Sequence, residues 1–85
     1  MNQSVIFTDQ LYIEADAVKF IAQQQGIHIA CFISFSLLSQ LNQDKFVDAN
    51  NAEIYFELCR FDIEDKAEAL IEEEAFSDKG DIQLI

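Results

Sequence analysis

The chain has 85 residues, a length that fits one domain over residues 1–85 and leaves no room for a second. Its 16 acidic and five basic residues give a formal net charge of −11, which argues against direct binding to nucleic-acid phosphates or anionic membranes. The hydrophobic content of 51% is sufficient for a packed core and excludes general disorder.

The first half of the chain shows the patterns of short strands. Residues 4–7 predict a strand that ends at Phe7, and residues 11–13 are expected to be extended or irregular. Apolar residues then alternate over residues 17–24 and again over residues 27–34, on either side of Gly26. Alternation across a glycine-containing turn is typical of a β-hairpin. The second hairpin strand is apolar on nearly both faces, which indicates a central position in the sheet.

Two helices are predicted to follow the hairpin. Ser36 suits the N-cap of a short helix over residues 37–43. A longer helix is predicted over residues 52–74, because apolar side chains recur there at helical spacing. This stripe comprises Ala52, Phe56, Cys59, Ile63, Ala67 and Leu70, flanked by Tyr55 and Ile71.

The first half of the long helix carries a second apolar group on its opposite side, formed by Ile54, Leu58 and Phe61. Two interpretations are open. The group packs against Leu37, Leu38 and Leu41 of the short helix, or it forms a dimer or partner surface.

A last short strand is predicted over residues 81–85. The element order then predicts an α+β fold, with a small, mainly antiparallel sheet built from the N-terminal strand, the hairpin and the C-terminal strand. The short and the long helix are expected to pack on one face of this sheet, because both apolar stripes are buried that way.

The sequence shows no catalytic or cofactor-binding motif. The soft metal ligands are His28, Cys31 and Cys59, and the first two point to opposite faces of a strand, whereas structural zinc takes four ligands. The single histidine is placed in mid-strand, and two isolated glycines cannot form a phosphate-binding loop. We therefore predict no catalytic residue, no metal and no cofactor.

The charge is unevenly distributed along the chain. Residues 1–43 hold three acids and one base, a net of −2, whereas residues 44–85 hold 13 acids and four bases, a net of −9. On the long helix, the spacing favours ion pairs between Glu57 and Arg60, Arg60 and Glu64, and Asp62 and Lys66. This acidic side is either a solvated face that keeps the protein soluble or a docking surface for a basic partner. The candidate interaction residues are Glu57, Arg60, Asp62, Glu64 and Glu68.

A further pattern is formed by residues 4–9, 18–20, 22–26, 56–65, 67–68, 70–73 and 76. Together these segments resemble the small bacterial family catalogued as domain of unknown function 1488. Its most specific part is the Arg-Phe-Asp-Ile-Glu run at residues 60–64. The resemblance implies a compact α+β domain and supplies no activity, cofactor or catalytic residue.

We expect a cytoplasmic protein, because two cysteines and the lack of a signal-peptide pattern suit a reducing compartment. Three functional hypotheses follow. The first is a non-enzymatic interaction module whose acidic helix meets a basic protein partner or a second copy of the chain. The second is a small-molecule binder or minor enzyme that uses His28, Tyr55 and Arg60 in a pocket between the hairpin and the helices. The third is an acidic mimic of nucleic acid.

Overall fold

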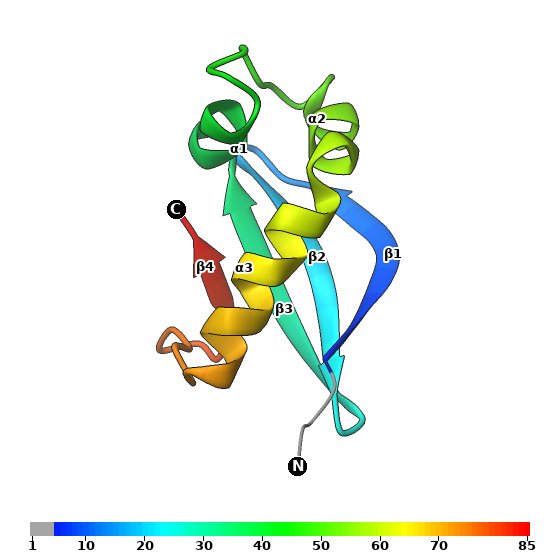
Figure 1. Cartoon of the computed structure of the whole chain (residues 1–85), viewed down its shortest axis with the longest axis vertical. Helices are drawn as coiled ribbons and strands as arrows, with labels where there is room; N and C mark the ends of the chain where they lie inside the picture. The colour runs from blue at the N-terminus through cyan, green and yellow to red at the C-terminus, as the bar shows by residue number, and fades with distance from the viewer. Residues whose placement is uncertain (1–4) are drawn as a thin grey trace.

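The computed structural model describes residues 5–85, which form four strands and three helices (Figure 1). In chain order these are β1 (Ile6–Ile13), β2 (Ala17–Gln24), β3 (Ile27–Ser34), α1 (Phe35–Leu41), α2 (Ala52–Leu58), α3 (Arg60–Glu72) and β4 (Ile82–Leu84). The sheet order is β1-β2-β3-β4, with antiparallel pairing except between β3 and β4, which are parallel. The predicted α+β class with a mainly antiparallel sheet is confirmed.

The β2–β3 hairpin is confirmed with the predicted bounds. The two strands pair without interruption from Ala17 opposite Ser34 to Gln24 opposite Ile27. Both turn residues have positive φ, 55° at Gln25 and 80° at Gly26, as a type I′ turn requires. A Cβ on Gly26 would meet nothing within 4 Å, so glycine serves the backbone conformation here and not a close contact. β3 lies between β2 and β4, which confirms its central position.

Strand β1 continues beyond the point where the sequence predicted its end. The predicted stop after Phe7 is wrong, and the predicted residue Ser4 lies outside the described residues. The register shifts instead: Phe7 pairs with Ala22 and Leu11 with Phe20, so four steps along β1 match two along β2. Phe7 and Leu11, on either side of this irregularity, both pack against the core. The centroid of the Phe7 ring lies 6.1 Å from that of the Phe20 ring.

Helix α1 begins two residues earlier than predicted, and Ser36 is not its N-cap. Ser34 is still extended, with ψ 150°, and its hydroxyl accepts a hydrogen bond from the Leu37 amide at 3.0 Å. The helix therefore starts directly from the end of β3. It stops before Gln43 and Asp44, whose φ values of 62° and 63° are left-handed.

The predicted single helix over residues 52–74 is wrong, because the chain forms two helices, α2 and α3, on either side of Cys59. This residue has φ −128° and ψ 29°, and serves as the C-cap of α2 and the N-cap of α3. Figure 1 shows that α3 runs diagonally across the sheet while α2, like α1, lies at one end of it.

Hydrogen bonds at the break explain why it is stable. In an unbroken helix the Cys59 amide would donate to the Tyr55 carbonyl, but here it donates to the Phe56 carbonyl at 3.1 Å. The Tyr55 carbonyl accepts from the Cys59 thiol at 3.2 Å and from Asn42 Nδ2 at 3.4 Å instead. Asn42 follows α1, so a side chain from another element stabilises the break.

The core lies between the helices and one face of the sheet. The predicted helical stripe is buried at Ala52, Phe56, Ile63 and Ala67, and Ile71 is more deeply buried than Leu70. The Phe56 ring meets Phe20 edge to face, with centroids 5.1 Å apart. The remaining fully buried side chains come mainly from the hairpin, α1 and β4. They include Val18, Ala22, Cys31, Ile33, Leu38 and Ile82.

Candidate functional site

Arg60 joins α2 to α3 across the break. Its guanidinium makes a bidentate contact with Glu57, with Nε donating to Oε1 at 2.8 Å and Nη2 to Oε2 at 2.6 Å. Nη1 donates to Glu64 Oε2 at 3.1 Å, and the guanidinium carbon lies 5.1 Å from the centroid of the buried Phe56 ring. We call Glu57, Arg60 and Glu64 the arginine clamp. Two of the ion pairs predicted from helical spacing are thus confirmed.

The contact between Arg60 and Glu57 shifts the pKa values of both groups. Hydrogen bonding to Glu57 raises the pKa of Arg60, and the hydrogen bond from Arg60 lowers the pKa of Glu57. The Arg60 side chain is only 17% exposed, and its donors are directed to two carboxylates. An arginine engaged in this way is not free to bind an anionic substrate, which argues against its use in a catalytic pocket.

Removal of the clamp is expected to lower stability in a pH-dependent way. Arg60→Met should reduce the free energy of unfolding by about 1 kcal/mol at pH 7, as for a well-oriented surface ion pair. Because the pKa of Glu57 is depressed in the folded state, the clamp stabilises above the pKa of an unfolded glutamate and loses its effect as Glu57 becomes protonated. The difference between Arg60→Met and wild type in urea unfolding should therefore shrink below about pH 4.

Lys66→Met is the control for the clamp variant, since Lys66 lies on the same helix and is in no ion pair within 4.0 Å among residues 5–85. It should leave the free energy of unfolding within about 0.5 kcal/mol of wild type. Equal losses in the two variants, or a loss in Arg60→Met that persists at low pH, would contradict the role assigned to the clamp.

The other two predicted interaction residues are not part of the clamp. Asp62 is exposed and Glu68 is half-buried, and in the described part of the chain neither side chain forms a hydrogen bond or ion pair. The predicted pair between Asp62 and Lys66 is absent from residues 5–85. The candidate residues therefore divide into the clamp, whose members pair with one another, and two carboxylates that form no hydrogen bond or ion pair among residues 5–85.

Three large apolar side chains at the helix break are exposed to solvent. The exposed fractions are 63% for Ile54, 70% for Leu58 and 80% for Phe61, and we call these residues the α2–α3 patch. Of the two interpretations left open by the sequence, packing on Leu37, Leu38 and Leu41 is wrong, because all three side chains are exposed. Contact between α1 and α2 is made on another side of α2, where Asn42 hydrogen-bonds to the Tyr55 carbonyl and approaches the Cys59 thiol. The alternative, a partner surface, is compatible with this exposure.

Sequence analysis also overlooked Phe46, which is 76% exposed in the segment between α1 and α2. Its carbonyl accepts a hydrogen bond from Asn51 Nδ2 at 3.0 Å, which ties this segment to the start of α2. The sequence did contain a signal for this exposure, because Phe46 is the aromatic residue of a mainly polar segment between the two helices.

The residues of the small-molecule hypothesis are not brought together. His28 is exposed on the hairpin, where Nε2 lies 3.0 Å from Gln23 Nε2. It lines a pocket of about 390 Å³ beside Phe76 and Gly80, but neither Tyr55 nor Arg60 lines that pocket. A general base without a neighbouring nucleophile gives no catalytic arrangement.

The two cysteines are unsuited to nucleophilic chemistry. Burial raises the pKa of Cys31 to about 12, and burial also raises the pKa of Cys59. Cys31 lies in the core and His28 on the exposed side of the hairpin, as the strand pattern predicted. Among residues 5–85, no group of three or more His, Cys, Asp or Glu side chains is arranged to hold a metal ion. No helix in that range has the length and apolar character needed to cross a membrane.

Comparisons with known proteins agree with this fold. A solved structure of a protein of unknown function from the DUF1488 family of Shewanella loihica PV-4 is similar, with a TM-score of 0.90 and 48% sequence identity. The match covers 99% of this chain and 94% of the other. Comparison with curated proteins finds no match. The sequence profile described as "Protein of unknown function (DUF1488)" matches residues 5–84, and the chain therefore belongs to the DUF1488 family.

Proposed function

We propose that this protein is a non-enzymatic interaction module of the cytoplasm that binds a basic, partly apolar segment of another protein. The observation that supports this proposal is the α2–α3 patch, in which Ile54, Leu58 and Phe61 are between 63% and 80% exposed. Large apolar side chains left exposed on a small domain can mark interaction sites, and these three lie within eight residues of one another on either side of the helix break.

The charges near the patch specify the chemistry of the partner. Glu53, Asp62 and Asp65 are exposed acids on the same two helices. The bases on these helices are Arg60, which is engaged by the clamp, and the exposed Lys66, so acids predominate. A partner that offers lysines or arginines around apolar side chains would satisfy both components of this surface. Electrostatic complementarity of this kind contributes specificity and increases association rates.

Charge also favours a different protein over a second copy of this chain. Each molecule has a formal net charge of −11, so two copies joined at this surface would bring acidic residues face to face. Like charges placed opposite each other are unfavourable across an interface. We therefore expect the isolated protein to be monomeric, which a solution mass measurement can check.

The experiment uses a synthetic amphipathic helical peptide of leucine and lysine, with a leucine–glutamate peptide of the same pattern as its counterpart. The basic peptide should shift the backbone NMR resonances of α2 and α3, and 300 mM salt should weaken binding several-fold. Leu58→Ser or Phe61→Ser should weaken binding by about tenfold or more, since buried apolar anchors dominate interfaces. Asp62→Lys should also weaken binding of the basic peptide relative to wild type, because it replaces an acid with a base at this surface.

Ile27→Ser is the matched control, because Ile27 is 65% exposed on the hairpin, away from the patch. It should bind the basic peptide as wild type does. The proposal is wrong if the basic peptide binds equally well to Leu58→Ser and Phe61→Ser, or if its resonance shifts map to the sheet. A dimer that Leu58→Ser dissociates would instead support self-association through the same patch.

A further inference from the structure

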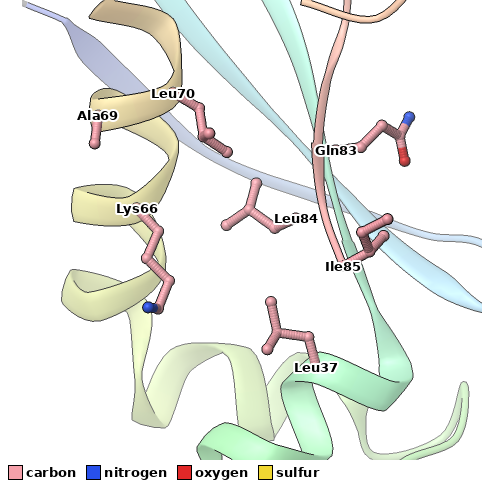
Figure 2. Close-up of a pocket in the computed structure, with 7 residues that line it drawn as sticks. All are labelled: Leu37, Lys66, Ala69, Leu70, Gln83, Leu84 and Ile85. Carbon is pink, nitrogen blue, oxygen red and sulfur yellow. The ribbon is translucent and has the colours of Figure 1, made fainter. Parts of the chain in front are cut away.

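A second concave site lies between α3, α1 and β4, apart from the α2–α3 patch. It is a pocket of about 420 Å³, within the size range of small-molecule sites in proteins. Figure 2 shows the residues that line it. They are Leu37, Lys66, Ala69, Leu70, Gln83, Leu84 and Ile85.

The wall of this pocket is mainly apolar. Leu37 comes from α1, Leu70 from α3 and Leu84 from β4, and in Figure 2 their side chains converge on the opening. Gln83 points away from it, as expected for a strand in which Ile82 and Leu84 are buried on the helix side. An alkyl chain placed here would bury part of its apolar surface against these leucine side chains.

One charged side chain lines the pocket, and it is a lysine in a protein with 16 acids and five bases. Lys66 extends from α3 toward the end of the pocket where Leu37 lies (Figure 2). In the described range 5–85, no carboxylate lies within 4.0 Å of its ammonium group, although Asp62 is one helical turn away. The ammonium group is therefore available to an anion at the edge of an open, mainly apolar pocket.

We propose that this pocket binds a small amphipathic carboxylate of the medium-chain fatty acid class. The alkyl chain lies among Leu37, Leu70 and Leu84, and the carboxylate meets Lys66. The charge complementarity is local: Lys66 is the charged side chain among the residues that line the pocket, although the whole chain is acidic. The site is separate from the surface of the proposed function, because Ile54, Leu58 and Phe61 do not line it.

The test is an NMR titration of the labelled protein with octanoate, octanol and octylamine. Octanoate should shift the amide resonances of Leu37, Lys66, Leu70 and Leu84. Octanol should bind roughly five- to tenfold more weakly than octanoate, because it has the same alkyl chain but no charge to meet Lys66. Octylamine should bind more weakly still, because its head group has the same charge as Lys66.

Lys66→Met, which keeps the alkyl stem, should reduce octanoate affinity to that of octanol and leave octanol affinity unchanged. Lys45→Met, an exposed lysine between α1 and α2, is the matched control and should bind octanoate as wild type does.

A second variant tests the cavity itself. Ala69 is exposed on α3, so Ala69→Trp should preserve the fold while filling the opening, and binding of both octanoate and octanol should be lost. Unchanged octanoate affinity in Lys66→Met or in Ala69→Trp would overturn the proposal. Octanoate shifts centred on Leu58 and Phe61 would also overturn it. Peptide binding at the α2–α3 patch is measured separately, so either proposal can fail without the other.

Discussion

Replacing Phe56 with alanine is expected to lower the free energy of unfolding by about 3–5 kcal/mol. Phe56 is fully buried, meets Phe20 edge to face at 5.1 Å, and supports the guanidinium of Arg60. The truncation removes apolar contact on all these sides and leaves a cavity beneath the helix break. Since a domain of this length has a stability on the order of 4–13 kcal/mol, the variant should be strongly destabilised.

Phe61→Ala is the matched control, because it removes the same side chain five positions later from a site that is 80% exposed. Its free energy of unfolding should stay within about 0.5 kcal/mol of wild type. Urea unfolding followed by far-ultraviolet circular dichroism measures both variants, and comparable losses would show that Phe61 is packed and not exposed.

Ile82→Ala is expected to cost about 2–5 kcal/mol, although β4 is only three residues long. Ile82 is fully buried opposite Cys31, and with Leu84 it supplies the helix-facing side of β4. The strand makes its ladder contacts with β3 alone among the described strands. Loss of this anchor should therefore increase hydrogen exchange in β4 before it affects the hairpin.

Ile85→Ala provides the comparison, because Ile85 is 88% exposed three residues later. It should leave both the free energy of unfolding and the exchange rates in β4 close to wild type. If Ile82→Ala proved as mild as Ile85→Ala, the contribution of β4 to the core would be smaller than its burial indicates.

The hairpin was predictable because its signals are local. The alternation over residues 17–34 and the glycine at position 26 determine both strands and the turn between them. The clamp pairs were predictable for the same reason, since spacings of three and four residues place Glu57, Arg60 and Glu64 near one another even across the break.

The helix break was not predictable from the local pattern. No proline or glycine lies near Cys59, and the apolar stripe continues through it. The hydrogen bonds that replace the helical one involve Asn42, 17 residues earlier in the chain. A feature that depends on the packing of α1 against α2 has no signature in the periodicity of the helix itself.

The exposure of the α2–α3 patch was also a matter of tertiary packing. Periodicity placed Ile54 and Leu58 on a second apolar side but did not determine whether α1 would cover it. In the structure α1 meets α2 near Tyr55 and Cys59, which leaves these side chains in water. Lys66 is a similar case, because its spacing from Asp62 favoured an ion pair, whereas its side chain lines the pocket and extends toward the end where Leu37 lies.

The placement of α3 across one face of the sheet, with α2 at the end of the sheet, gives the molecule an uneven charge distribution. Residues 44–85 contain 13 of the 16 acids, whereas the strand-forming first half is nearly neutral. A cationic body approaching in dilute buffer would experience a torque that turns the helical side toward it before the surfaces touch. This orienting field decays over about 8 Å at physiological ionic strength, so salt would slow productive encounters more than it would hasten dissociation.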